Sequence, residues 1–326
     1  MKYDFITVGG AVEDITFKTA EGVVIDNKKD ILRQKLFAFE YGAKIKASAM
    51  FRFPGGGASN AAVCLSRLGF AAGAVAAVGD DEAGRRLMKN FDEDGVDTRL
   101  IKVSRGQETG FSFIVIGPGN EHVAFLYRGA NDDLRLSRID AQMLNYSKWV
   151  YVSSLSGDWE DALDKIFSAK NARTAWNPGS TQLKSGALRL RKFLKKTEIL
   201  FLNKDEAVEL AISENEYRKR GGELLKNGRL LAEILKKFGP KAVVITDGEN
   251  GADYFSGDKF YHGDSFRVPP EKIADTTGVG DAFCSTFTAG LELYGGNIEK
   301  AMKLAMKNSA SVLKESGAQN GLMAIN

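Results

Sequence analysis

The sequence predicts an α/β protein whose mostly parallel sheet carries helices on both faces. Two observations support this prediction. Short apolar runs typical of buried strands alternate along the 326-residue chain with stretches of helical spacing. This repeated order favours parallel strands joined by helices. Glycine-rich turns also lead directly into two of the helices, an arrangement in which backbone N–H groups can bind an anion.

The first strand is expected at residues 5–10, where a β-branched and apolar run ends in Gly9-Gly10. Further strands and the helices between them follow the same apolar periodicity. The strands are predicted at 74–78, 149–152, 173–176, 199–202 and 242–246, and the helices at 61–68, 83–94, 159–170, 188–195, 230–238 and 299–314. No internal repeat or low-complexity linker divides the chain, so we expect one main domain over residues 1–326.

Two lid segments, residues 15–53 and 110–128, break the α/β rhythm. The first mixes short alternating stretches with charges, and the second holds two strand-like runs around Gly117-Pro118-Gly119-Asn120, a strong hairpin signal. We expect both lid segments to lie outside the core as a small β-sheet that covers a site. Exposed strand edges in such a sheet favour pairing between the lids of two copies, and so a homodimer.

The stretch from Asp275 to Phe283 reads D-T-T-G-V-G-D-A-F and opens a predicted helix. Its two glycines, Gly278 and Gly280, allow the backbone N–H groups at the helix start to approach a bulky anion such as a phosphate. Asp281 adds a carboxylate beside that anion site, as expected for a base that takes a proton from an attacking hydroxyl. The motif alone leaves open that Asp281 is an ordinary helix cap.

A second glycine-rich turn, Pro54-Gly55-Gly56-Gly57-Ala58-Ser59-Asn60, precedes the helix at 61–68 and makes Asn60 available to a ligand. Asp14 follows the first strand on the side where open α/β sheets bind ligands. Its carboxylate suits two hydroxyl groups of a polyol, although a solvated loop aspartate fits the position as well. The dinucleotide fingerprint fails because Asn60 replaces its third glycine, and no Gly-Lys pair provides a Walker-A loop.

Asn203 and Glu206 follow the strand at 199–202 and lie three residues apart at a helix start. They fit either a pair that holds a Mg²⁺-bound water near phosphates or a simple capping box. Thr246 ends the strand at 242–246, and together with Gly248 and Gly251 it forms a plausible loop at the edge of a nucleotide site.

Composition excludes several other functions. The net charge of +3 arises from 45 basic and 42 acidic residues without a dense basic block, so nucleic-acid binding is not expected. Two cysteines and two histidines are too few for a disulfide framework, a histidine-rich zinc site or a Ser-His-Asp hydrolase. No stretch of membrane-spanning length or apolar leader occurs in the sequence. A reducing, cytoplasmic setting is consistent with these features.

Taken together, these motifs resemble the ribokinase-like (phosphofructokinase B) family of carbohydrate kinases over nearly the whole chain. Residues 55–62, G-G-G-A-S-N-A-A, are similar to the N-terminal glycine motif of that family, and residues 275–281 to its D-T-x-G-A-G-D signature, with Val279 at the usually small position. Gly129-Ala130-Asn131, Asn177-Pro178 and the Asn-x-x-Glu element at 203–206 match further family landmarks in the same order.

The resemblance implies a ribokinase-like three-layer fold and an ATP- and Mg²⁺-dependent transfer of phosphate to a sugar hydroxyl. Asp281 would be the catalytic base, and the backbone from Thr277 through Gly280, including Gly278 and Val279, would form the anion hole. The roles implied for the remaining residues are sugar binding for Asp14, Gly55, Gly56, Gly57 and Asn60; phosphate and Mg²⁺ organisation for Asn203 and Glu206; nucleotide contact for Thr246, Gly248, Gly251 and Asn308; and a monovalent cation such as K⁺ for Asp275 and Thr277.

Substrate identity stays open at this level. Gly57 stands where many ribokinases carry lysine, so a lysine contact to a sugar or sugar phosphate is absent. A nucleoside kinase is the alternative within the family, because Phe37, Phe39, Phe111 and Phe113 would give the lid an aromatic surface for a base. The same phenylalanines would equally fill a small core of the lid or a dimer contact, which we favour. A catalytically inactive sugar-binding regulator is the alternative of another class, and the intact 278–281 motif argues against it.

Overall fold

The computed structural model describes residues 3–27, 30, 35–118 and 122–325. Its centre is a sheet of eight strands in the order β16-β15-β14-β13-β12-β11-β1-β6. The six strands from β14 to β6 run parallel, and β15 and β16 add an antiparallel hairpin. The strands are β1 (Tyr3–Val8), β6 (Ala72–Val75), β11 (Ser147–Val152), β12 (Arg173–Trp176), β13 (Ile199–Asn203), β14 (Ala242–Thr246), β15 (Ala252–Phe255) and β16 (Phe260–Gly263).

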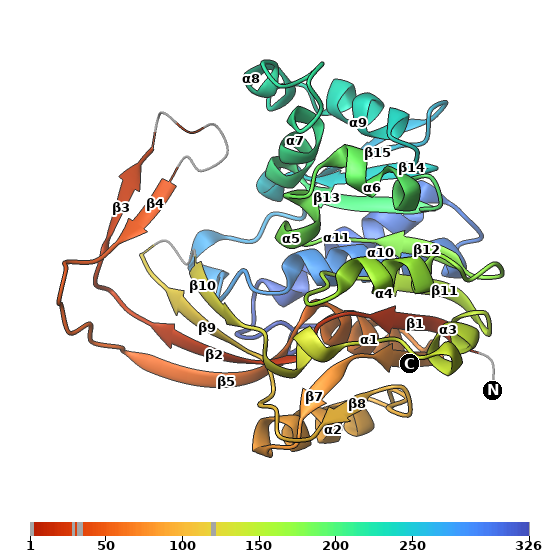
Figure 1. Cartoon of the computed structure of the whole chain (residues 1–326). Helices are drawn as coiled ribbons and strands as arrows, with labels where there is room; N and C mark the ends of the chain where they lie inside the picture. The colour runs from red at the N-terminus through yellow and green to blue at the C-terminus, as the bar shows by residue number, and fades with distance from the viewer. Residues whose placement is uncertain (1–2, 28–29, 31–34, 119–121, 326) are drawn as a thin grey trace.

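Helices cover both faces of this sheet, as Figure 1 shows. Side chains that alternate along each strand enter two separate apolar clusters, one on each face. One face carries α3 (Arg138–Leu144), α4 (Trp159–Ile166), α5 (Ser180–Leu183), α6 (Ala187–Leu194), α7 (Lys204–Ile212), α8 (Gly221–Leu224) and α9 (Gly228–Lys237); the other carries α1 (Gly57–Arg67), α2 (Glu82–Glu93), α10 (Val279–Leu293) and α11 (Ile298–Val312). The predicted three-layer α/β fold is confirmed.

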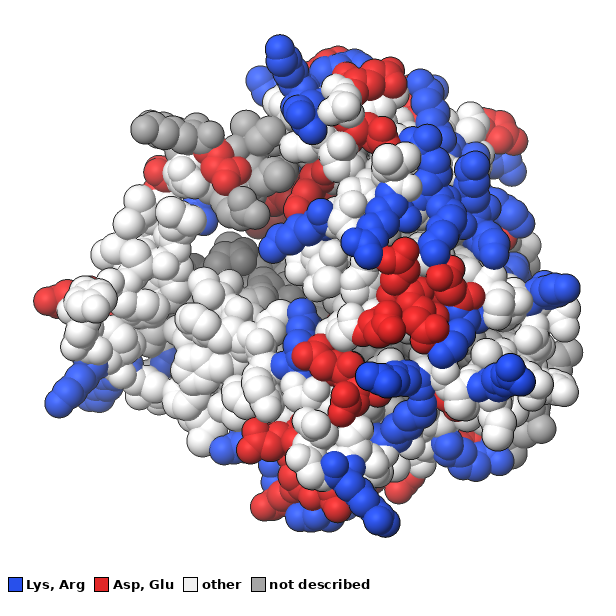
Figure 2. All heavy atoms as spheres, viewed as in Figure 1, with Lys and Arg blue, Asp and Glu red and all other residues white. Residues whose placement is uncertain are grey.

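A second sheet forms the lid, which projects from the α/β body (Figure 1). Its order is β10-β9-β2-β5, with β2 and β9 parallel and the outer pairs antiparallel. A hairpin of two further strands extends the lid. The lid strands are β2 (Val12–Lys18), β3 (Val23–Asp26), β4 (Lys35–Ala38), β5 (Ala49–Gly55), β9 (Phe111–Ile116) and β10 (His122–Tyr127). On the face shown in Figure 2, charged side chains gather on the body while the lid surface is largely uncharged.

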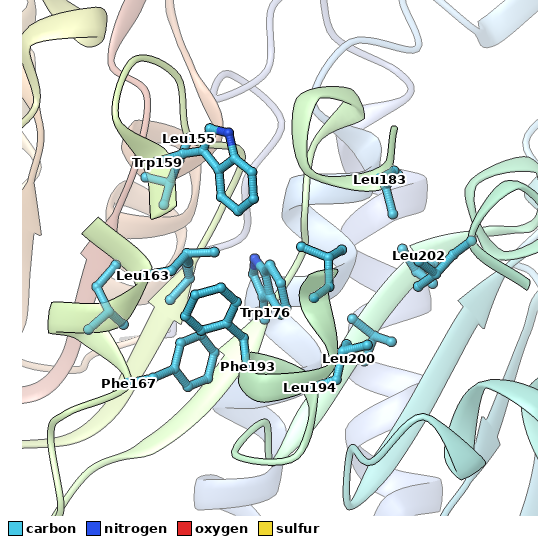
Figure 3. Packing of buried hydrophobic residues seen from close by; sticks show 14 of the residues in the cluster. Leu155, Trp159, Leu163, Phe167, Trp176, Leu183, Phe193, Leu194, Leu200 and Leu202 are labelled. Atoms are coloured by element: carbon cyan, nitrogen blue, oxygen red, sulfur yellow. The ribbon is translucent and has the colours of Figure 1, made fainter. Parts of the chain in front are cut away.

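The core beside α4 and α6 explains why the helices on that face hold their places (Figure 3). The Trp176 and Phe167 rings lie 5.7 Å apart in an edge-on arrangement, and the Phe193 ring lies 5.5 Å from Phe167. Such aromatic contacts add to the free energy gained by burying the rings. This layer fixes β12 and β13, and so the strand end that carries Asn203.

Several predicted elements differ in detail from the observed ones. The strand expected at 74–78 is split at Ala76, and β7 (Ala77–Gly79) pairs with β8 (Lys102–Ser104) outside the main sheet. The helix expected at 159–170 ends at Ile166. The runs at 111–116 and 122–127 pair as the antiparallel strands β9 and β10, but residues 119 and 120 of the turn predicted at 117–120 lie outside the described part of the chain.

Candidate active site

A pocket lies between the inner face of the lid and the carboxyl ends of the central parallel strands. Its floor consists of the residues that follow β1 and β11 and of the starts of α1 and α10. Its lining comprises Gly9, Gly10, Gly56, Gly57, Asn60, Asn131, Leu134, Ser154, Leu155, Ser156, Thr277, Gly278 and Asp281 from the body, with Val12, Asp14, Ser112, Ile114, His122, Ala124, Leu126 and Arg128 from the lid side. The structure therefore brings the two glycine-rich motifs and Asp14 to one place.

The start of α10 has the features of an anion site. Gly278 adopts a left-handed conformation with φ of 76° at the N-cap, where no side chain caps the helix. A Cβ at Gly278 would lie 2.3 Å from the Cβ of Ala318, whereas one at Gly280 would meet open space. The open space beside Gly280 leaves room for an anion at the uncapped N–H groups that follow Gly278, and the helix dipole favours negative charge there.

Asp281 is held by a chain of side-chain hydrogen bonds. Asn60 Nδ2 donates to Asp281 Oδ2 at 2.8 Å, and Asn60 Oδ1 accepts a hydrogen bond from Gln319 Nε2 at 3.0 Å. Gln319 Oε1 in turn accepts from Asn90 Nδ2 at 2.9 Å. Burial raises the pKa of Asp281, and the Asn60 hydrogen bond opposes that rise. The alternative of an ordinary cap does not describe Asp281, because α10 has no side-chain cap.

The sequence led us to expect Asp14 in the loop after the first strand. In the structure it lies within the next strand, the lid strand β2. It is buried, and burial raises its pKa to about 7 even though Ser112 hydrogen-bonds to it. The negative charge of Asp281 adds to this rise. A Cβ at Gly55 would lie 2.0 Å from Asp14 Oδ2, so glycine is required for the carboxyl group to fit. Gly56, with φ of 93°, packs directly on the backbone of Gly10.

Gly57 opens α1 beside the same carboxylate. A Cβ at this position would lie 3.3 Å from Asp281 Oδ1 and 2.8 Å from Ser153 Cβ. The space that a longer side chain would need is therefore occupied by Ser153 and the Asp281 carboxyl group.

Asp275 and Thr277 frame the anion site from behind. Asp275 is buried, and its carboxylate accepts hydrogen bonds from the N–H groups of Thr277 at 2.8 Å and Gly317 at 3.2 Å. The buried hydroxyl of Thr277 has no partner among the described residues, although it lies beside the pocket. Lys18 Nζ donates to the Ala274 carbonyl oxygen at 3.1 Å, so a lid ammonium group ties β2 to the residue before Asp275.

Asn203 and Glu206 form a capping box at the start of α7. Glu206 N donates to Asn203 Oδ1, and Asn203 N donates to Glu206 Oε2, each at 2.9 Å. Burial raises the pKa of Glu206 to about 7, and the Asp281 charge contributes to that rise. The structure thus contains the capping box, and the Glu206 carboxyl group is close enough to Asp281 for the Asp281 charge to affect its pKa.

The remaining nucleotide-side residues divide into two groups. Thr246 ends β14 and Gly248 follows it near the surface, whereas Gly251 is a turn glycine whose added Cβ would lie 2.0 Å from the Gly263 carbonyl oxygen. Asn308 lies inside α11, where its amide bonds Thr286 Oγ1 at 2.7 Å and accepts from Met323 N at 2.8 Å. Its polar atoms are engaged in the core, so its side chain is not positioned for a nucleotide.

Sequence reasoning did not assign a role to several pocket residues. Ser112 bonds Asp14, and His122 Nδ1 lies 3.1 Å from Thr276 Oγ1, which links the lid to the 275–281 motif. Arg128 lines the pocket, and Gln319 positions Asn60. The alternation of the run at 122–128 indicates which of its residues share a face, but not that this face closes over the pocket.

Comparison with known proteins identifies the family of the chain. The model of the pfkB family of carbohydrate kinases matches residues 23–325. The ribokinase of Bacillus subtilis is 26% identical over 291 residues, which cover 86% of this chain and 88% of that protein. A solved Arabidopsis thaliana ribokinase with ribose and ATP has a TM-score of 0.78 at 19% identity over 99% of this chain and 96% of that one. A Burkholderia thailandensis nucleoside kinase with inosine has a TM-score of 0.76 at 19% identity, covering 98% and 94%.

A carboxylate beside an uncapped helix terminus in a lidded α/β pocket is the arrangement expected of a phosphotransferase with a hydroxyl acceptor. The chain belongs to the pfkB family of carbohydrate kinases, which confirms the resemblance seen in the sequence. It is accordingly a sugar or nucleoside kinase of the ribokinase type. Among the described residues, no helix is long and apolar enough to cross a membrane.

Proposed function

We propose that the chain is an ATP-dependent kinase that phosphorylates a hydroxyl group of a small sugar. The observation that carries this proposal is the Asp281 carboxylate, which Asn60 holds at 2.8 Å beside the uncapped start of α10. This carboxylate forms no ion pair with any described residue and lies beside the proposed anion site. That arrangement suits a general base that takes the proton of the acceptor hydroxyl group. The oxygen of this hydroxyl group then attacks a phosphoryl group in the same pocket.

Each part of the pocket has a role in this reaction. Asp281 takes the hydroxyl proton, and its raised pKa makes it a stronger base than an ordinary aspartate. The N–H groups after Gly278 and the unpartnered Thr277 hydroxyl stabilise the charge that develops on the transferring group. Asp14, Asn60 and the glycines of residues 55–57 orient the acceptor hydroxyls. The lid excludes water, which limits hydrolysis of the phosphoryl donor.

ATP and Mg²⁺ fit this donor set in different ways. ATP supplies the phosphoryl group, and Mg²⁺ neutralises phosphate charge when bound. Among the described residues, no group of three or more His, Cys, Asp or Glu side chains could hold a metal ion alone. We therefore propose that Glu206 meets Mg²⁺ through water, as is common for this ion. Asn203 would keep Glu206 oriented, and Thr246 and Gly248 would border the nucleotide.

We further propose a monovalent cation such as K⁺ at Asp275 and Thr277. Asp275 is a buried carboxylate without an ion-pair partner among the described residues, so a bound cation would offset its charge. Replacing K⁺ with tetramethylammonium in the assay should lower kcat, and an unchanged kcat would remove this cation from the account.

A sugar is favoured over a nucleoside by the direction of the lid aromatics. Ser112 and Ile114 line the pocket, so Phe111 and Phe113 on the same strand point to the opposite face. Phe113 instead packs against Phe17 at 5.0 Å between ring centroids. No Phe, Tyr or Trp of the described chain lines the pocket, which leaves a nucleobase without an aromatic partner. The nucleoside kinase remains the second candidate, supported by the likeness to the inosine-bound enzyme.

We propose that the chain, a single kinase domain, forms a homodimer in which the lids of the two copies are in contact. Phe125 and Tyr127 on the outer face of β10 are 61% and 44% exposed, and Met50 on β5 is 51% exposed. Because β5 and β10 are also the edge strands of the lid sheet, both apolar area and unpaired backbone groups are available to a second lid.

The proposed function is tested by following ATP consumption and the phosphorylated product in parallel across ribose, fructose, ketodeoxygluconate, adenosine and inosine. We expect stoichiometric phosphorylation of at least one sugar, with kcat/KM above that for both nucleosides. Higher kcat/KM for a nucleoside would favour the second candidate. Binding of sugars without any product would instead support an inactive sugar-binding regulator.

A further inference from the structure

The inner face of β10 spans the pocket from one end to the other. His122, Ala124, Leu126 and Arg128 line the pocket, as alternate residues of one extended segment do. His122 marks the end near the anion site, because its Nδ1 lies 3.1 Å from Thr276 Oγ1. Arg128 directly follows the strand and therefore marks the opposite end.

Strand register places Arg128 relative to the acceptor residue Asp14. Asp14 is paired with Ser112, and Ser112 with Leu126, so these three residues lie in one row across the lid. Arg128 lies two residues beyond Leu126, about 7 Å further along the strand direction. Its backbone is fixed there, because the Arg128 carbonyl oxygen accepts a hydrogen bond from Asn131 Nδ2 at 3.1 Å.

Among the described residues, no side chain pairs with the Arg128 guanidinium, in contrast to other arginines near the base of the lid. Arg52 and Arg86 both form ion pairs with Glu13 at 2.7 Å. Arg128 is half-buried and makes no side-chain hydrogen bond or ion pair with any described residue. It is also the one Lys or Arg among the described pocket-lining residues. A partly desolvated cation of this kind is satisfied by an anion, and a forked guanidinium suits two oxygens of one group.

We propose that Arg128 binds an anionic group of the acceptor, so that the preferred substrate is a sugar with a carboxylate or phosphate remote from the reacting hydroxyl. This inference rests on the proposed kinase function and specifies its substrate class. Asp14 and Asn60 bind hydroxyls in the middle of the pocket, and Asp281 activates one of them. Arg128 fixes the far end of the molecule, and a neutral sugar leaves that guanidinium unpaired.

Three compounds with the same carbon skeleton isolate the anionic group. The compounds D-fructose, 2-keto-D-gluconate and D-fructose 1-phosphate share their configuration from C3 to C6. They differ at C1, which is a hydroxymethyl group in the first, a carboxylate in the second and a phosphorylated hydroxymethyl group in the third. The corresponding series built on D-tagatose covers the other configuration at C4. Kinase rates with ATP are measured for all six compounds with the wild-type protein and with Arg128→Gln, Arg128→Lys and Arg105→Gln. Arg105 is exposed and lies outside the pocket, so Arg105→Gln controls for loss of one arginine.

We expect one anionic member to exceed its neutral counterpart in kcat/KM by about 10-fold to 100-fold, the usual range for a charge-assisted hydrogen-bonded contact. The anionic group that Arg128 binds is identified by which compound, the carboxylate or the phosphate, has the higher kcat/KM. Arg128→Gln should reduce that ratio to about 2 or less while the neutral member keeps its kcat/KM, and Arg128→Lys should give an intermediate ratio. Arg105→Gln should keep the wild-type ratio.

Two results would overturn the inference alone: phosphorylation of the neutral sugars in preference to both anionic members, or an equal loss for all members in Arg128→Gln. Thermal unfolding of Arg128→Gln checks that its fold is intact, and Arg128→Lys supplies the same comparison if it is not. If none of the six compounds nor any sugar of the wider panel is phosphorylated, the proposed kinase function itself fails and this inference falls with it.

Discussion

At the scale of single residues, Asp14 is a buried carboxyl group whose charged form opposes folding. Its carboxyl group is 5% exposed and shares the pocket with Asp281, so its pKa rises to about 7. An unfolded chain would release this proton near pH 4. Between about pH 4 and pH 7 the folded chain therefore holds a proton that the unfolded chain lacks, and the free energy of unfolding falls as pH rises.

Asp14→Asn should therefore raise the melting temperature at pH 8, by at least about 2 °C, because it removes the cost of a buried charge. At pH 4, where the wild-type carboxyl group is protonated in the folded chain, the two proteins should melt nearly together. Calorimetry at both pH values provides the measurement. Equal shifts at both pH values, or a lower melting temperature at pH 8, would show that the Asp14 charge is not penalised in the fold.

Residue roles could be predicted from the sequence only where a motif carries them. Asp281, Gly278 and Asn60 belong to such motifs, and the structure brings all three into the pocket. Gln319 could not be assigned, because it lies 259 residues from its partner Asn60 and no local pattern links them. Arg128 likewise gains its position from the pairing of β9 and β10 with the rest of the lid.

At the scale of elements, the strands with apolar runs and their mostly parallel arrangement were predicted, while the order of the strands in the sheet was not. The β15–β16 hairpin was not predicted, since its residues mix charges and aromatics. The alternation of β9 was present in the sequence, but without the lid topology it did not reveal which face meets the pocket. The orientation of β9 bears on the choice between a sugar and a nucleoside as substrate. Phe111 and Phe113 lie on the outer side of the strand, away from the pocket.

Two variants of β9 test that assignment of faces. Phe113→Ala should lower the stability of the lid by disrupting its contacts with Phe17 and Phe125, without changing KM for the sugar by more than about 2-fold. Ile114→Ala, one residue along and on the pocket side, should change KM more than Phe113→Ala does. Steady-state kinetics with both variants supplies the measurement. A tenfold rise in KM for a nucleoside in Phe113→Ala would restore the stacking role.

At the scale of the whole molecule, the largely uncharged lid surface contrasts with the charged body on the face shown in Figure 2. Exposed large apolar side chains are scattered on most proteins, but here several of them gather on one projecting sheet, whose edge strands β5 and β10 are open. The sequence indicated open edges, whereas the concentration of apolar side chains on the outer face of β10 required the structure.

Phe125→Glu should convert a lid-mediated dimer into a monomer, because it places a charge in the apolar contact. Leu188→Glu is the matched control: Leu188 is 76% exposed but lies on α6 of the body. Light scattering at several concentrations gives the mass of each variant. A monomeric wild-type protein, or loss of the dimer in Leu188→Glu but not in Phe125→Glu, would argue against pairing through the lid.

The most direct test of the central claim compares phosphoryl transfer by the wild-type protein and Asp281→Asn with the best acceptor found. Asparagine keeps the shape of the side chain but cannot take a proton, so kcat should fall by about 10²- to 10⁴-fold while the affinity for ATP, measured by calorimetry, stays within about twofold. In the wild-type protein kcat should decrease with falling pH at a higher pH than an ordinary aspartate would require, since burial raises the pKa of Asp281. An Asp281→Asn variant that keeps half of the wild-type kcat would contradict the account.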